Sequence, residues 1–215
     1  MNAQERQLRQ ELISYAKALN STGLSEGKSG NLSVRCDNGL LITPSGLDYQ
    51  SLKPADIVKL TLAGEKCCDS PYSASSEWHF HCGIYQNKPA ISAIVHAHPN
   101  YSTALACTSR AIPAFHYMVA IAGGTSIPLA SYAIFGSEQL SVNTLNALKT
   151  ANACLLENHG LVVCGSNLSK TFQLTEEIET LAKQYCLALS IGNVKLLTEE
   201  EMQAVIEKFK DYQRG

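Results

Sequence analysis

The chain has 215 residues, of which 45% are hydrophobic, and its formal net charge is only −2. This composition suits one α/β domain over residues 1–215, and the weak net charge excludes a general electrostatic attraction to nucleic acid or to a membrane surface, so we expect neither partner. The eight cysteines form no C-x-x-C pair and the charged N-terminus lacks an apolar leader, which favours a cytoplasmic protein with reduced thiols.

The expected elements begin with an amphipathic helix over residues 3–20. Two short strands follow at 32–35 and 40–43. The dipeptide Asn38-Gly39 lies between them and predicts a two-residue hairpin turn.

The rest of the chain continues this alternation of helices and strands without an internal repeat or a linker. The segment 115–135 is the exception, since it is rich in Gly and Pro and is expected to be irregular. The other expected elements are helices at 77–89, 101–108, 169–191, 198–212 and from Ser137, a strand at 91–98, and two strands separated by a turn within 153–164.

Two histidines, His96 and His98, come at the end of an apolar run. Side chains two apart in a strand face the same side, so both imidazoles can reach one metal ion. His159 stands in an Asn-His-Gly turn, where Gly160 permits a tight bend. Paired histidines can also be packing or surface residues. Three neutral imidazoles, however, leave open the fourth position that is typical of a catalytic zinc site.

Glu77 is the expected fourth participant in this site. It stands at a predicted helix start, where the helix dipole favours an anion and Ser75 or Ser76 can cap the helix. A glutamate at such a position often does no more than stabilise its helix. The two serines and the three histidines favour a role in proton transfer.

The other three histidines are weaker candidates. His79 and His81 lie on the same predicted helix as Glu77, and His81 shares its face at a spacing of four residues. We expect His81 to support the site from outside the metal ligand set. The sequence assigns no role to His79 or His116.

Three small loops rich in Gly and Ser lie at 27–31, 43–46 and 75–76. Backbone N–H groups of such loops, together with a helix N-terminus, can bind a phosphate without a basic patch. Each loop alone is weak evidence, because turns of this composition are common. The run 23–29 is similar to a P-loop, but it is one residue short and follows a helix, so we expect no nucleotide site.

Together these motifs resemble the class II aldolase family, whose members are zinc enzymes that include sugar-phosphate aldolases and 4-epimerases. The segment 112–124 is similar to the branch that acts on L-fuculose 1-phosphate. The other matching stretches are GKSGNLSVR at 27–35, ITPSG at 42–46, SSEWHFH at 75–81, AIVHAHP at 93–99 and NHG at 158–160.

The resemblance implies an α/β/α sandwich around a mainly antiparallel sheet, assembled as a homotetramer with sites between subunits. It also implies a Zn²⁺ ion in each subunit on His96, His98 and His159, with Glu77 near or on the metal. The implied positions for the substrate phosphate are Gly30, Asn31, Ser45, Gly46, Ser75 and Ser76.

Two tyrosines and one departure complete the resemblance. Tyr117 matches the family's tyrosine proton donor, and Tyr212 matches a C-terminal tyrosine that helps to place the aldehyde. Lys28 stands where aldolases of this type often have threonine. Its contact with the phosphate or with solvent is therefore left open.

The implied reaction is reversible aldol cleavage of a ketose 1-phosphate between its third and fourth carbons. The products are dihydroxyacetone phosphate and a small aldehyde. L-Fuculose 1-phosphate, which yields L-lactaldehyde, is the first candidate substrate. Zinc would act as a Lewis acid, Glu77 would exchange a proton on the dihydroxyacetone-phosphate half, and Tyr117 would exchange one on the aldehyde oxygen.

Several alternatives stay open at this point. A 4-epimerase or dehydratase of the same family would use similar residues, although the epimerases usually have aspartate in place of Glu77. An aldolase for another deoxy-ketose 1-phosphate also fits. A metal-free scaffold would be expected to lack the histidines, and an unrelated zinc hydrolase would not need the phosphate loops. Manganese or cobalt could replace zinc.

Overall fold

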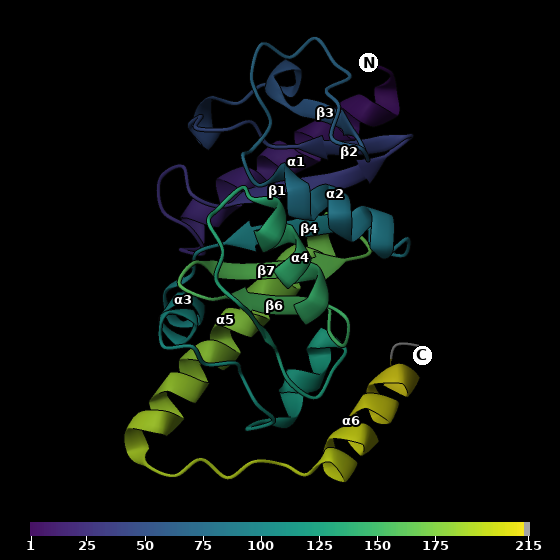
Figure 1. Ribbon diagram of the computed structural model, residues 1–215. Helices are drawn as coiled ribbons and strands as arrows, with labels where there is room; N and C mark the ends of the chain where they lie inside the picture. The colour runs from purple at the N-terminus through teal and green to yellow at the C-terminus, as the bar shows by residue number, and fades with distance from the viewer. Residues whose placement is uncertain (213–215) are drawn as a thin grey trace.

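The computed structural model describes residues 1–212 and contains one sheet of seven strands in the order β3-β2-β1-β4-β7-β6-β5 (Figure 1). Neighbouring strands are antiparallel except for β5 and β6, which run parallel, so the expectation of a mainly antiparallel sheet is confirmed. The strands are β1 Asn31–Cys36, β2 Gly39–Ile42, β3 Val58–Thr61, β4 Ala93–Ala97, β5 Leu129–Ala130, β6 Ala153–Leu156 and β7 Gly160–Gly165.

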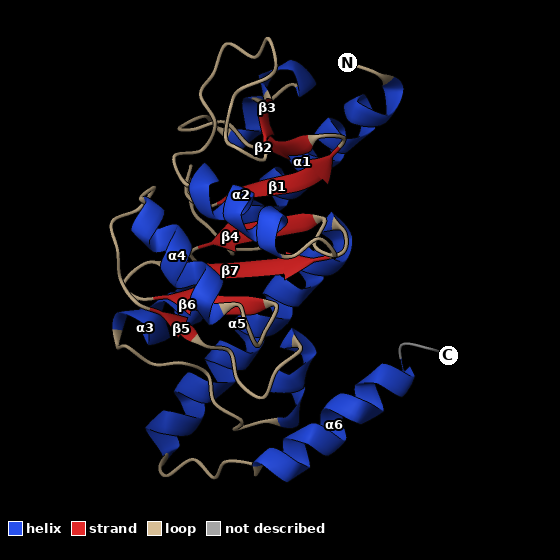
Figure 2. Cartoon of the chain, turned by 45° about the vertical axis from the view of Figure 1, so that its right-hand side comes forward, coloured by secondary structure: helices blue, strands red, loops and turns tan. Residues whose placement is uncertain are grey.

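Helices cover both faces of this sheet, which confirms the expected α/β/α sandwich (Figure 2). Helices α2 and α4 pack on one face, and α1, α3 and α5 pack on the other. The α-helices are α1 Ala3–Ser21, α2 Trp78–Asn87, α3 Asn100–Cys107, α4 Glu138–Ala147, α5 Leu168–Ile191 and α6 Glu199–Tyr212, and the short 3-10 helices are η1 Tyr49–Ser51, η2 Pro54–Asp56 and η3 Tyr117–Ala122. None of these helices is long and apolar enough to cross a membrane.

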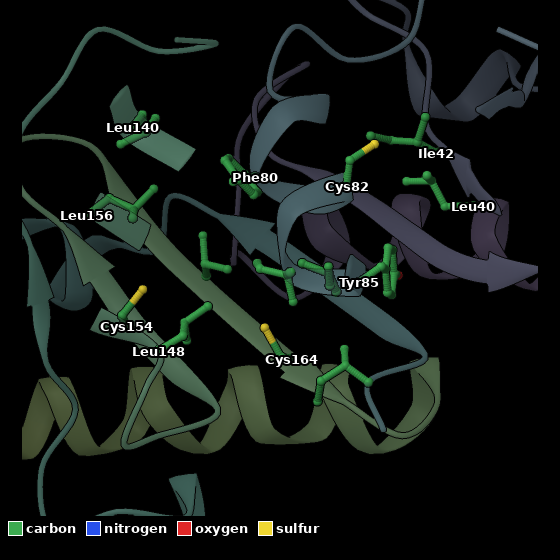
Figure 3. Packing of buried hydrophobic residues seen from close by; sticks show 14 of the residues in the cluster. Leu40, Ile42, Phe80, Cys82, Tyr85, Leu140, Leu148, Cys154, Leu156 and Cys164 are labelled. Carbon is green, nitrogen blue, oxygen red and sulfur yellow. The ribbon is translucent and has the colours of Figure 1, made fainter. Parts of the chain in front are cut away.

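The central strand β4 is buried on both faces, because alternate residues enter different layers of the core. Ile94 packs in the layer under α2 and α4, and Val95 packs in the layer under α1 and α5. Figure 3 shows the first of these layers, where Phe80 and Tyr85 of α2 meet residues of the strands. Burial on both faces explains why β4 is an unbroken apolar run rather than an alternating one. The same alternation turns His96 towards α2.

The turn between β1 and β2 lies one residue earlier than the sequence predicted. Cys36 pairs with Gly39, so the two loop residues are Asp37 and Asn38, and Gly39 is already the first residue of β2. Asn38 has the positive φ angle of 62° that the turn requires. Asparagine tolerates this conformation better than most residues, so glycine is not needed inside the turn.

The C-terminal helix α6, predicted at 198–212, begins with a capping box formed by Thr198 and Glu201. The N–H of Thr198 donates to Oε2 of Glu201 at 2.8 Å, and the N–H of Glu201 donates to Oγ1 of Thr198 at 3.2 Å. Met202 is buried in the same cluster as residues of η3.

The segment 115–135 was expected to be irregular. In the structure it contains the 3-10 helix η3 and the short strand β5.

Candidate metal centre and phosphate pocket

The three histidines predicted as metal ligands lie together. His96 is in β4, His98 lies one residue beyond its end, and His159 is in the turn between β6 and β7. One nitrogen from each ring lies within 4.8 Å of the nitrogens from the other two. Three converging imidazoles fit a divalent metal such as zinc, which accepts three protein ligands and keeps a further position for substrate.

His96 is held with one defined nitrogen facing the centre. Its Nδ1 lies 3.0 Å from the carbonyl oxygen of Leu161 on β7, and the imidazole ring is fully buried. A carbonyl oxygen only accepts hydrogen bonds, so Nδ1 carries a hydrogen and Nε2 is the nitrogen that remains to bind a metal. Such a contact to the second ring nitrogen is the usual way in which a ligating histidine is oriented.

Gly160 has a different role from the one that the sequence suggested. The residue with a left-handed backbone in this turn is Asn158, at a φ angle of 52°. A Cβ atom at Gly160 would lie 2.6 Å from the carbonyl oxygen of Ala97 and 2.7 Å from Cδ2 of His98. Glycine is therefore needed because β7 approaches the end of β4 closely, and this approach places His159 beside His98.

Glu77 lies at the same centre, immediately before α2 rather than within its first turn. Its Oε2 is 3.0 Å from Nε2 of His96, and its Oε1 is 3.3 Å from Nε2 of His159. The second contact satisfies no hydrogen-bond geometry, so Oε1 is a buried oxygen without a hydrogen-bond donor among the described residues. A buried carboxylate oxygen aimed at three imidazoles is consistent with a cation between them.

The protonation states of this group suit a metal centre. Burial lowers the pKa of His98 to about 3 and that of His159 to about 4, so both rings are neutral near pH 7. Burial raises the pKa of Glu77, but the charge of His96 and its hydrogen bond outweigh this effect and hold it well below its usual value. Burial lowers the pKa of His96, but the charge of Glu77 and the hydrogen bond between them outweigh this effect and raise it, so a metal binding at Nε2 of His96 would displace a hydrogen shared with Glu77. The forms that bind metal are neutral imidazoles and an ionised carboxylate.

The three predicted phosphate loops open into one hollow of about 460 Å³. Two backbone hydrogen bonds join the second loop to the third and to the residues just before it, from the N–H of Ser75 to the oxygen of Thr43 at 3.1 Å and from the N–H of Ser45 to the oxygen of Ser73 at 3.0 Å. The residues that line the hollow from these loops are Lys28, Ser29, Gly30, Asn31, Pro44, Ser45, Gly46, Ser75 and Ser76, and Glu77, His98 and His159 line it beside them.

Backbone N–H groups in these loops are available to an anion. Among the residues that the structure describes, the N–H groups of Gly30, Gly46 and Ser76 have no acceptor. Gly30 and Gly46 have left-handed φ angles of 80° and 70°. At Gly30 a Cβ atom would lie 2.7 Å from the carbonyl oxygen of His96. The first loop is therefore packed directly on the strand that carries a metal ligand.

Asn31 has contacts that the sequence did not predict. Its Nδ2 donates to Oε2 of Glu77 at 2.9 Å, and its Oδ1 lies 2.6 Å from Nε2 of His81. The side chain therefore contacts the carboxylate of the centre as well as the hollow. His81 lies outside the histidine group, as the sequence predicted.

Tyr117, one of the two tyrosines assigned from the family, does not line the hollow within this chain. Tyr117 is half-exposed and lines a separate hollow with Val205, Lys208 and Phe209 of α6. Tyr212 is the last residue of α6, and its side chain lies outside the described residues.

One wall of the hollow, formed by residues 132–135, was not predicted from the sequence. Tyr132, Ala133 and Phe135 line it, and the residues Tyr132 and Phe135 are 57% and 65% exposed. The N–H of Tyr132 donates to Oε2 of Glu157 at 2.9 Å, which ties this wall to the turn that carries His159. The sequence feature that could have indicated this wall is the presence of two aromatic residues, Tyr132 and Phe135, in a loop that contains glycine.

Comparison with known proteins agrees with this geometry. The family model described as "Class II Aldolase and Adducin N-terminal domain" matches residues 10–186. A 5-methylthioribulose-1-phosphate/5-deoxyribulose-1-phosphate aldolase of Rhodospirillum rubrum is 47% identical over 205 residues, covering 95% of this chain and 92% of the relative. The L-fuculose phosphate aldolase of Escherichia coli strain K12 is 43% identical over 206 residues, covering 95% of each chain.

A solved structure supports the same relationship. The structure of an L-fuculose 1-phosphate aldolase superimposes with a TM-score of 0.91 at 42% identity. The match covers 95% of this chain and 96% of the other. The similarity thus extends over the sheet, both helical layers and the hollow.

Proposed function

This chain belongs to the class II aldolase family, and we propose that it cleaves a ketose 1-phosphate between the third and fourth carbons, with zinc as its metal. The observation that supports the proposal best is one hollow that combines His98, His159 and Glu77 with three hydroxyl-rich loops. A metal centre next to an anion pocket suits a phosphorylated sugar in which the carbon–carbon bond to be cleaved lies a few atoms from the phosphate.

His96, His98 and His159 would hold the metal, and neutral imidazoles suit zinc well. When bound, the metal supplies Lewis-acid stabilisation of the negative charge that develops on the ketose oxygens as the carbon–carbon bond breaks.

Glu77 would move the proton on the dihydroxyacetone-phosphate half of the substrate. Its carboxylate is ionised near pH 7 and lines the hollow beside His159. A carboxylate in this place can accept a proton from carbon in the direction of synthesis and return it after cleavage. Family epimerases usually have aspartate here, so the glutamate supports aldol cleavage over epimerisation.

The loops would bind the phosphate through hydroxyl and N–H groups of Ser45, Gly46, Ser75 and Ser76. Lys28 lines the same hollow and adds a positive charge at its edge. These contacts would hold the ketose in one position, and that position decides which of its carbon atoms lies next to Glu77.

L-Fuculose 1-phosphate is the first candidate substrate, and a 5-deoxy or 5-methylthio pentulose 1-phosphate is the second. The name of the Rhodospirillum rubrum relative supports the second candidate. These sugars share a ketose 1-phosphate at one end and an apolar carbon at the other. The apolar wall of Tyr132, Ala133 and Phe135 is suited to that second end.

We propose that neighbouring subunits complete the site. The chain's own Tyr117 lies in a different hollow, so a tyrosine that protonates the aldehyde oxygen would have to come from another copy. A homotetramer with shared sites would meet this need, with Tyr212 helping to place the aldehyde.

The test is a cleavage assay on a panel of ketose 1-phosphates with the zinc-loaded protein. We expect release of dihydroxyacetone phosphate from L-fuculose 1-phosphate or from 5-deoxyribulose 1-phosphate, and the ratio of their kcat/KM values identifies the substrate. Epimerisation without net cleavage, or no reaction with any ketose 1-phosphate, would contradict the proposal.

A further inference from the structure

A chain of buried hydrogen bonds joins Glu77 to the interior of the protein. It runs through side chains of β1 and α2 in the order Glu77, Asn31, His81, Ser33 and Tyr85. Consecutive polar atoms are 2.9, 2.6, 2.7 and 2.9 Å apart. Each of the five side chains is at least nine-tenths buried, so solvent does not replace these contacts.

This series of hydrogen bonds depends on a match between the spacing of side chains along a strand and their spacing along a helix. Asn31 and Ser33 are two apart in β1 and face the same layer, while residues 77, 81 and 85 recur every four residues on the side of α2 that faces β1. Helix α2 therefore places a glutamate, a histidine and a tyrosine opposite an asparagine and a serine.

The donor and the acceptor of each hydrogen bond in this series follow from the ionised carboxylate of Glu77 at one end. Glu77 can only accept, so Asn31 turns its Nδ2 to Glu77 and its Oδ1 to His81. Oδ1 also only accepts, so Nε2 of His81 must carry the ring hydrogen. Nδ1 of His81 then accepts from the hydroxyl of Ser33, whose oxygen accepts from Tyr85.

We infer that His81 is a positioning residue for the aldol reaction, acting on Glu77 through Asn31. The inference rests on the proposed function of Glu77. A neutral His81 with its hydrogen on Nε2 keeps the amide of Asn31 from rotating. The fixed amide in turn holds Oε2 of Glu77 at one point, 3.0 Å from His96, and leaves Oε1 facing His159.

Three variants test this inference by steady-state kinetics and metal content. His81→Leu removes both contacts of the ring, His81→Gln keeps one donor and one acceptor, and Ile84→Val is the control for a change in the buried face of the same helix. We expect His81→Leu to retain its metal and lose kcat by roughly 10- to 100-fold, since residues that orient a metal centre have effects of this size. KM should change less than about threefold. His81→Gln should recover most of the loss, and Ile84→Val should match the parent.

A double variant decides whether Asn31 transmits the effect. If it does, adding His81→Leu to Asn31→Ala should lower kcat no further than Asn31→Ala does alone. Losses that multiply, a parent-like kcat for His81→Leu, or an equal loss in Ile84→Val would each overturn the inference.

A measurement without substrate separates this inference from the proposed function. In ¹⁵N-histidine NMR spectra of the zinc-loaded parent, His81 should be neutral with its hydrogen on Nε2, and Asn31→Ala should change its signals. A hydrogen on Nδ1 of His81 would overturn the inference even in an active enzyme. A parent that cleaves no ketose 1-phosphate would instead refute the proposed function, whatever the NMR result.

Discussion

The Nε2 atoms of His96 and His98 lie 2.9 Å apart. The carbonyl of Leu161 keeps a hydrogen of His96 on Nδ1, so the nitrogen that faces His98 offers a lone pair to a metal when the ring is neutral. The carboxylate of Glu77 is within 3.0 Å of the same nitrogen. These nitrogen and oxygen atoms are potential metal ligands, and they lie close enough together to bind one divalent ion.

Removal of one ligand should remove the metal. His159→Ala should lose tight zinc binding, because the centre then has one metal ligand fewer than in the parent. The far-ultraviolet circular dichroism should stay close to that of the parent, since His159 lies in a turn. Metal analysis after dialysis measures the effect. His79→Ala is the matched control, since His79 lies outside the histidine group. Full zinc occupancy in His159→Ala would disprove the assignment.

Replacement of the carboxylate of Glu77 should separate binding from turnover. In Glu77→Gln the amide oxygen can still accept the hydrogen bond from Asn31, but a neutral amide cannot carry a proton. We expect the metal to stay and kcat to fall by roughly a hundred- to ten-thousandfold. Cleavage rates with the zinc-loaded variant test this. A rate near that of the parent would remove Glu77 from the mechanism.

Loss of a loop hydroxyl should weaken substrate binding more than turnover. Ser45→Ala and Ser76→Ala should each raise KM, because a lost hydrogen bond to a charged group costs about 1.5–3 kcal/mol. Ser73→Ala is the control, because Ser73 lies two residues before the third loop and does not line the main hollow. Equal efficiency of the parent on fuculose with and without its phosphate would contradict the phosphate site.

Two inactive variants should restore activity when they are mixed. If Tyr117 acts in the site of a neighbouring subunit, Tyr117→Phe and Glu77→Gln damage different halves of a shared site. Mixed oligomers, formed by joint refolding or co-expression, should then contain some intact sites and exceed the activity of either variant alone. Activity no higher than the average of the two would place both residues in one subunit's site.

A chain that ends at Phe209 extends this test to the C-terminus. It lacks Tyr212, so it should bind zinc as the parent does but lose turnover or selectivity between aldehydes. Unchanged kinetics with every aldehyde would show that the last residues have no part in the reaction.

Acid should destabilise the metal-free protein partly through His81. Burial lowers the pKa of His81 to about 3, against 6.5 for an unperturbed histidine. Between these values the unfolded chain binds a proton that the folded chain does not. The free energy of unfolding should therefore fall as the pH falls from 6.5 towards 3, by up to about 1.4 kcal/mol per pH unit. Urea unfolding at several pH values should show a shallower dependence in His81→Leu. An identical dependence in both proteins would contradict this reading.

Much of the fold followed from local patterns in the sequence. The apolar run at β4 predicted a strand, and the pattern of residues 198–212 predicted α6. The side-chain period of β-structure placed His96 and His98 together even though His98 lies just past the strand end. These predictions needed only neighbours a few residues apart.

Other features depended on which elements pack together. Asn31 and Glu77 are 46 residues apart and meet only because β1 pairs with β4 under α2. The sequence predicted a phosphate contact for Asn31 and could not show its bond to Glu77. Nor could it show that Gly160 serves a close approach of strands rather than a turn.

The chain's sequence by itself thus determined the types of groups that take part: three imidazoles, a carboxylate, and loops rich in glycine and serine. Only the tertiary structure decided their mutual distances, the tautomer of His96, the aromatic wall at Tyr132 and Phe135, and the separation of Tyr117 from the hollow. The physical reason is the sequence separation over which each kind of interaction acts. Periodicity and turn chemistry act over a few residues, whereas the environment of a side chain is set by sheet register and helix packing between distant segments.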